Sequence, residues 1–188
     1  MEQDVKETAV LAAGQLRQTL GELRQEQLDR LMQVIQDADH IFFAAAGRSM
    51  LMLRCMAMRL MQLGFQCYIV GDTTTPAFQA GDLLITASGS GETAYTIAVA
   101  GKAKKIGGTV AAITIRRESA LGRLADLVVG VEARSDKVDD PDQKQTVLPG
   151  GSLFEQSVLL MGDAMVVPLA RKNGIPLDRA FQRHANLE

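Results

Sequence analysis

The chain has 188 residues, of which 47% are hydrophobic, and this is typical of one globular domain with a substantial apolar core. Lys and Arg total 20 against 22 Asp and Glu, a net charge of -2, so the chain lacks the basic surface that binds phosphate backbones. Trp is absent and aromatic residues make up 4%, which also disfavours the base-stacking platforms of single-strand binders. We therefore expect no nucleic-acid partner.

The two cysteines do not indicate a structural zinc site. Cys55 and Cys67 lie in apolar stretches without CxxC spacing, and the chain has only two histidines. Acidic residues stand at the start, where a signal peptide needs an apolar run, and no stretch of about 18 uncharged apolar residues occurs. These features predict a soluble cytoplasmic protein with no bound metal and no membrane partner.

The first part of the chain predicts helices followed by a parallel sheet. Apolar residues at helical spacing over residues 4–38 indicate two amphipathic helices, broken near Gly21. Five short apolar runs follow, and we interpret them as strands: 41–46, 67–70, 83–87, 109–115 and 127–131. The runs are continuous rather than alternating, which is typical of strands covered on both faces. Helical segments at 50–63 and 93–106 separate several of them, so the order is βαβ.

The last part of the chain predicts a loop and two further helices. Apolar periodicity stops over residues 132–149, which we interpret as a surface loop. A helix over about 153–171 follows, and a last helix is expected after Pro176. We expect an α/β three-layer sandwich in a single domain over 1–188, with a helical segment at about 3–38, a sheet region at about 41–131 and C-terminal helices at about 152–187.

The helix after the first strand is unusually apolar. Residues 50–61 hold five of the nine methionines, and Arg54 and Arg59 are the only charged residues among them. A helix that is apolar on nearly all sides needs cover on nearly all sides. One interpretation is that the sheet and the N-terminal helices cover this helix, and another is that a second subunit covers part of it. The two interpretations are compatible.

Two strand ends carry residues suited to ligand binding, because open parallel sheets bind ligands at the carboxyl ends of their strands. The first strand leads into Arg48 and Ser49. The third leads into a loop that opens the next helix: Ser88, Gly89, Ser90, Gly91, Glu92 and Thr93. Glycines that permit close approach, three hydroxyls and the unpaired N–H groups of a helix start favour an anion such as phosphate. The plainer alternative is that Ser90 is a helix cap and the glycines make a tight turn.

The same loop also fits the loose dinucleotide fingerprint GxGxxG/A, running from Gly89 to Ala94. Arg116 and Arg117, after the following strand, could then meet a 2′-phosphate, which makes an NADP-dependent oxidoreductase a formal alternative. Glu92 beside a pyrophosphate and the position of the fingerprint after the third strand count against it.

Three further side chains are candidates for chemistry. Arg48 can donate hydrogen bonds to phosphate or sugar oxygens, or it can be a solvated arginine in a first helical turn. Glu155 can act as a general base, or it can close a capping box with Ser152, since Ser152-Leu-Phe-Glu155 fits S-x-x-E. His184 can titrate near neutral pH, or it can pair with a helix dipole.

The sequence closely resembles the 6-phospho-3-hexuloisomerases, single-domain members of the sugar isomerase (SIS) superfamily, over nearly its whole length. The motifs that carry this resemblance are AGRSM at 46–50, AMRLMQLGF at 57–65, SGSGET at 88–93, AKKIGGTVAAITI at 103–115, GSLFEQ at 151–156 and HANLE at 184–188. SGSGET alone indicates only a SIS domain, whereas GSLFEQ together with HANLE is much more specific.

This resemblance implies a five-stranded parallel sheet between helices and a homo-oligomer, more often a tetramer than a dimer. It also implies interconversion of D-arabino-hex-3-ulose 6-phosphate and D-fructose 6-phosphate without metal or organic cofactor, a step of formaldehyde assimilation by the ribulose monophosphate pathway. The resemblance further implies that residues 88–93 bind the phosphate group, that Ser49 contacts the substrate and that Glu155 is the proton acceptor. We expect Arg48 to orient the sugar or to stabilise the oxyanion that develops during the reaction. We expect His184 to donate a proton to the enediol oxygens from a neighbouring subunit, as a histidine does in related isomerases.

The sequence departs from the family pattern beside the first strand end. Where the family commonly has GAGRSG, this chain has Ala45 and Met50 in place of two glycines. Two other functions therefore stay open: isomerisation of another phosphosugar, and binding of a sugar phosphate without conversion, as in SIS regulators.

Overall fold

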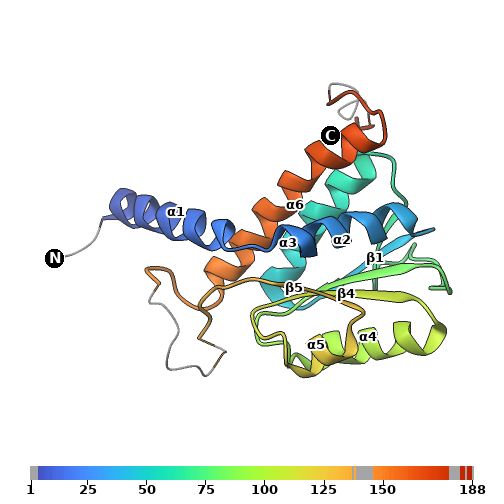
Figure 1. Cartoon of the computed structure of the whole chain (residues 1–188), viewed down its shortest axis with the longest axis horizontal. Helices are drawn as coiled ribbons and strands as arrows, with labels where there is room; N and C mark the ends of the chain where they lie inside the picture. The colour runs from blue at the N-terminus through green and yellow to red at the C-terminus, as the bar shows by residue number, and fades with distance from the viewer. Residues whose placement is uncertain (1–3, 137, 139–145, 178–182, 185, 188) are drawn as a thin grey trace.

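The structure is a computed structural model that describes residues 4–136, 138, 146–177, 183–184 and 186–187. Two helices come first, α1 (Val5–Gly21) and α2 (Gln25–Asp37), and a βα succession follows (Figure 1). Its elements are β1 (Ile41–Ala45), α3 (Gly47–Gln62), β2 (Cys67–Ile69), β3 (Leu83–Ala87), α4 (Ala94–Ile106), β4 (Thr109–Thr114), α5 (Ala120–Leu124), β5 (Leu127–Gly130) and α6 (Ser152–Lys172). This confirms the α/β fold class and its five strands.

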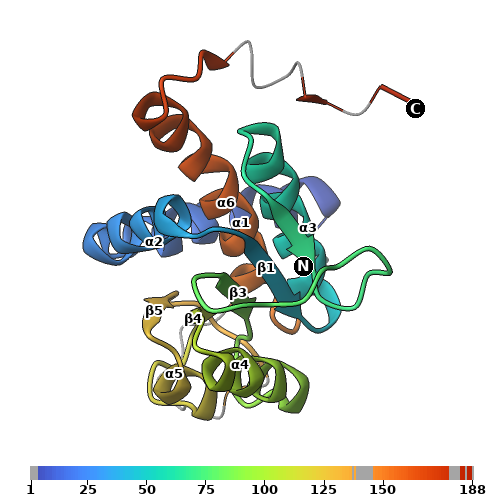
Figure 2. The same cartoon turned by 90° about the vertical axis from the view of Figure 1, so that its right-hand side faces the viewer.

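The five strands form one parallel sheet in the order β2-β1-β3-β4-β5. Successive side chains point to opposite faces of a strand, and here both faces are buried. Ile41, Phe43 and Ala45 join the core under α2, α3 and α6, whereas Phe42 and Ala44 join the core under α4 and α5. Figures 1 and 2 show these layers, with α4 and α5 on one side of the sheet and α2, α3 and α6 on the other. Burial on both faces explains why the strands read as continuous apolar runs.

The predicted helices differ from the structure in two places, and a third prediction is not tested. The methionine-rich helix begins at Gly47, three residues before the predicted start, and α5 was not predicted. The last helix expected after Pro176 falls mostly on residues 178–182, 185 and 188, which lie outside the described residues. The helix expected over 153–171 is confirmed, as α6 over Ser152–Lys172.

The prediction of a surface loop over residues 132–149 is wrong for its first part. Val131, Ala133 and Ser135 are buried, as is Val138. Every second side chain from Val131 to Ser135 turns inward, whereas Glu132 between them is exposed, and a hydrogen bond of 2.8 Å from the Ala133 N–H to the Val131 carbonyl tightens the backbone there. The alternation is hard to recognise in the sequence because one of its buried positions is a serine and the residues between them are charged.

Helices α3 and α6 pack closely and leave part of their surface apolar and exposed. A Cβ on Gly162 of α6 would lie 3.1 Å from the Cβ of Met56, so the glycine permits the close approach. The inner face of α3 is fully buried at Leu53 and Leu60, whereas Leu51 and Met58 are 55% and 53% exposed. The sheet and α6 therefore cover one side of the methionine-rich helix and leave the other uncovered within this chain.

One helix among the described residues, α6, is long and apolar enough by length and composition to cross a membrane. Half of its apolar window is buried inside the protein, where it includes Phe154, Val158 and Leu169. We therefore describe α6 as a core helix of this α/β fold.

Candidate functional site

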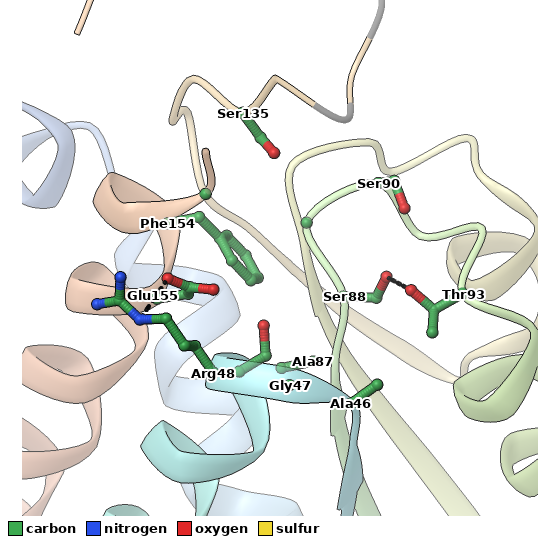
Figure 3. Close-up of a pocket in the computed structure, with 13 residues that line it drawn as sticks. Ala46, Gly47, Arg48, Ala87, Ser88, Ser90, Thr93, Ser135, Phe154 and Glu155 are labelled. Atoms are coloured by element: carbon green, nitrogen blue, oxygen red, sulfur yellow. Dashed lines mark hydrogen bonds and ion pairs between the residues drawn. The ribbon is translucent and has the colours of Figure 1, made fainter. Parts of the chain in front are cut away.

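A pocket of about 160 Å³ lies at the carboxyl ends of β1 and β3 (Figure 3). These strands are neighbours, with Ala45 paired to Ala87, although β2 lies between them in the sequence. The chain thus leaves β1 toward one edge of the sheet and β3 toward the other, which opens a crevice between their loops. The pocket is lined by Ala46, Gly47, Arg48, Ser49, Ala87, Ser88, Gly89, Ser90, Thr93, Ser135, Gly151, Phe154 and Glu155.

Hydroxyl groups hold the loop of residues 88–93 in shape. Ser88 Oγ lies 2.9 Å from Thr93 Oγ1 and accepts the N–H of Gly91 at 3.1 Å. Ser90 Oγ accepts the N–H of Glu92 at 3.3 Å. Thr93, and not Ser90, is the N-cap residue of α4, and its side chain makes no capping hydrogen bond. The first N–H groups of a helix have no partner within it, and at α4 no side chain of the N-cap residue occupies them. Such a helix start beside hydroxyl groups can favour an anion.

Gly91 and Glu92 belong to this loop but do not line the pocket. The Glu92 carboxylate accepts the N–H of Ala120 at 2.9 Å, at the start of α5. Gly91 has φ +67, and its carbonyl accepts the N–H of Leu121 at 3.0 Å. Ser119 lies so close to Gly91 that any Cβ there would collide with it. These two residues therefore attach the loop to α5.

On the other side of the pocket, Glu155 and Arg48 form an ion pair. Arg48 Nε lies 3.1 Å from Glu155 Oε2, and Arg48 also donates to Ser152 Oγ at 3.2 Å. The Glu155 side chain is 15% exposed. The capping-box interpretation is wrong, because Gly151 is the N-cap residue of α6 and no side chain caps it. The Glu155 carboxylate instead faces the pocket beside Arg48 (Figure 3).

Ser135 and Phe154 line the pocket and were not predicted as site residues. Ser135 is 3% exposed and comes from the buried stretch after β5. A Cβ on Gly89 would lie 3.6 Å from the Phe154 ring, so the ring forms a wall against the loop. The alternate spacing of Val131, Ala133 and Ser135 could have indicated Ser135. The position of Phe154 next to Glu155 could have indicated Phe154.

His184 does not line the pocket. Glu155 lies in the first turn of α6, and Lys172 ends that helix about 25 Å further along at 1.5 Å per residue. Arg183 lies against Gly64, just after the end of α3 that is remote from the pocket. Within one chain, the structure thus places the exposed His184 away from Glu155.

The described residues offer no metal-binding cluster of three or more His, Cys, Asp or Glu side chains. Burial raises the pKa of the Cys67 thiol to about 12, so this cysteine is not a nucleophile at neutral pH. Arg117, which the dinucleotide alternative would place at a 2′-phosphate, is paired with Glu132 at 2.9 Å. The groups gathered at the pocket are a hydroxyl-rich loop at a helix start on one side and a carboxylate on the other. The first can favour an anion and the second can transfer a proton.

Comparison with known proteins agrees with this site. The SIS domain family model matches residues 34–138. The chain is 44% identical to a 3-hexulose-6-phosphate isomerase of Bacillus subtilis, over 93% of this chain and 94% of the relative. It is 39% identical to a 3-hexulose-6-phosphate isomerase of Mycobacterium gastri, over 98% and 92%.

A solved structure gives the same result. A Methanococcus jannaschii protein, with an inferred molecular function of 3-hexulose-6-phosphate isomerase, superposes with a TM-score of 0.83 at 33% identity, over 97% of this chain and 99% of that one. The fold, the pocket between β1 and β3 and these relatives lead to one conclusion: the chain belongs to the SIS-domain proteins and, within them, to the 3-hexulose-6-phosphate isomerase family.

Proposed function

We propose that the protein interconverts D-arabino-hex-3-ulose 6-phosphate and D-fructose 6-phosphate. The observation that carries this proposal is the Glu155 carboxylate, which faces a pocket whose opposite wall is the loop of residues 88–93. The isomerases of Bacillus subtilis and Mycobacterium gastri, at 44% and 39% identity, support the choice of substrate.

The reaction moves a carbonyl group from C3 to C2 of the sugar. A base removes the proton from C2, an enediol forms between C2 and C3, and a proton returns to C3. C2 and C3 are adjacent in the planar enediol and can lose and gain their protons on the same face, so a single carboxylate can serve both steps. Glu155 is that base, and Ser49 contacts the sugar between Glu155 and the loop.

The phosphate group binds at residues 88–93. Ser88, Ser90 and Thr93 present hydroxyls around the start of α4, and the first N–H groups of that helix supply donors without a lysine. Gly89 leaves room for the phosphate against the Phe154 ring. Ser135, which is buried, lines the pocket beside these groups.

The site is completed by a second copy of the chain in a homo-oligomer, a tetramer in the simplest arrangement. The exposed apolar side chains of α3 supply a surface for that contact. His184 lies away from the pocket of its own chain, so it acts as the proton donor to the enediol oxygens in a neighbouring subunit. The protein works in the cytoplasm, as one SIS domain that needs no metal or organic cofactor.

A coupled assay tests this function. A synthase generates hex-3-ulose 6-phosphate from formaldehyde and ribulose 5-phosphate, the protein is added, and fructose 6-phosphate is measured. Formation of fructose 6-phosphate is the expected result. Binding of fructose 6-phosphate without conversion would identify a non-catalytic SIS protein, and conversion only of a different phosphosugar would identify another isomerase.

A further inference from the structure

Arg48 contacts the start of α6, on its own side of the pocket, and not the loop of residues 88–93 on the opposite side. It is the second residue of α3 and follows Gly47, whose φ of +60 suits a glycine. Its Nε lies 3.1 Å from Glu155 Oε2, and its NH1 donates to Ser152 Oγ at 3.2 Å. Among the described residues, both partners belong to the first turn of α6. Arg48 thus connects the end of β1 to the helix that carries the base.

The contact with Arg48 occupies one oxygen of the Glu155 carboxylate and leaves the other for the substrate. Oε2 faces the guanidinium, and the second oxygen points toward the middle of the pocket (Figure 3). The planar guanidinium can address Glu155 and Ser152 together, which a single ammonium group cannot do with the same geometry. The fork therefore fixes both the place and the direction of the free carboxylate oxygen.

We propose that Arg48 is a positioning residue that aims the Glu155 carboxylate at C2 and C3 of the substrate. This inference rests on the proposed function. The proton passes from C2 to the free oxygen of Glu155 and from there to C3, while Arg48 keeps all of its protons. One oxygen must reach two adjacent carbons in turn, so its position has to be held within a narrow range. A misplacement of about 1 Å can cost about 100-fold in rate.

The Arg48→Met variant tests this role, because methionine retains most of the apolar stem and loses the fork. We expect kcat to fall about 10- to 100-fold, as for other groups that orient a reacting ligand, with KM unchanged. Arg48→Lys should recover part of the loss. The matched control is Lys104→Met near the end of α4, on the opposite side of the sheet from α3. This variant breaks an ion pair with Asp126 that is not part of the pocket and should leave kcat and KM unchanged.

Calorimetry separates positioning from substrate binding. Fructose 6-phosphate is titrated into Glu155→Gln and into the double variant Arg48→Met with Glu155→Gln, neither of which turns over the ligand. Equal affinities are expected. A tenfold weaker affinity of the double variant would make Arg48 a substrate ligand and overturn the inference, and so would a rise in KM with unchanged kcat in Arg48→Met.

Failure of this inference differs from failure of the proposed function. An active wild type in which Arg48→Met keeps full kcat overturns the role of Arg48 alone. A wild type that binds fructose 6-phosphate and never isomerises it overturns the proposed function, and the role of Arg48 falls with it. Thermal unfolding of each variant identifies any loss of activity that comes from loss of fold.

Discussion

Glu155 is the residue on which the proposed chemistry depends most. Glu155→Gln keeps the size of the side chain and its acceptor oxygen for Arg48, but the amide cannot take a proton from carbon. We expect kcat to fall by about 10²- to 10⁴-fold, the contribution typical of a general base. Fructose 6-phosphate should still bind, because the loop of residues 88–93 is untouched, and calorimetry measures this. Full activity of the variant would remove Glu155 as the base.

A second residue-scale prediction concerns stability rather than activity. Thr86 is fully buried in β3, and its hydroxyl has no hydrogen-bond partner among the described residues. A buried hydroxyl without a partner costs about 1–3 kcal/mol. Thr86→Val keeps the shape and removes the hydroxyl, so we expect the free energy of unfolding to rise by about 1 kcal/mol in urea titrations.

Thr114 in the adjacent strand provides the matched control for Thr86. It is equally buried, but its hydroxyl donates to the carbonyl of Gly89 at 3.3 Å and accepts the N–H of Arg116 at 3.2 Å. Thr114→Val removes the acceptor of the Arg116 N–H and one of the two donors to the Gly89 carbonyl, which keeps the N–H of Ile115. We expect the variant to lower the free energy of unfolding by about 1 kcal/mol. Equal effects of the two substitutions would contradict the assignment of the unsatisfied hydroxyl to Thr86.

At the scale of elements, α5 supports the loop of residues 88–93, which we propose to bind the phosphate group. Its first N–H groups bind the Glu92 carboxylate and the Gly91 carbonyl. Glu92→Ala removes one of these attachments, and we expect fructose 6-phosphate to bind about three- to tenfold more weakly, the effect of losing one capping interaction. Glu92→Gln retains an acceptor oxygen and should bind almost as wild type does. Isothermal titration measures both.

Glu118 provides the control for the Glu92 variants. It is an exposed carboxylate just before α5, and Glu118→Ala removes the same charge without touching the loop of residues 88–93. Its affinity for fructose 6-phosphate should stay unchanged. If Glu92→Gln binds fructose 6-phosphate as weakly as Glu92→Ala does, the charge of Glu92 matters rather than its hydrogen bond. That result would contradict the prediction that α5 supports the loop through this hydrogen bond.

Sequence reasoning succeeded for those elements whose residues carry one strong signal. The runs around Phe43 and Ile85 could be predicted as strands because both faces are buried. The five-residue α5 was missed because it is too short to show a helical period. Glu155 and Arg48 could each be selected as candidates, but their contact joins residues 107 positions apart in the chain, and no local pattern encodes such a pair.

At the scale of the whole molecule, the exposed apolar surface on α3 predicts association. Leu51 and Met58 are more than half exposed on a helix whose other face is buried in the core, and such patches mark protein interfaces. We expect wild type to sediment as a homo-oligomer and Met58→Lys to shift it toward smaller species. Ile106→Lys is the control, because Ile106 is 49% exposed at the end of α4, on the opposite side of the sheet. A monomeric wild type would exclude the shared site.

Complementation decides whether the active site is shared between subunits. His184→Ala and Glu155→Gln are each expected to be nearly inactive, the first for lack of the proton donor and the second for lack of the base. If His184 acts in a neighbouring subunit, hybrid oligomers contain sites that combine the base of one variant with the histidine of the other. Mixing the two variants under conditions of subunit exchange should therefore restore part of the activity. Activity that does not return in oligomers shown to be hybrid would place both groups in one subunit, and would require the C-terminal segment to cross from the far end of α6 to the pocket of its own chain.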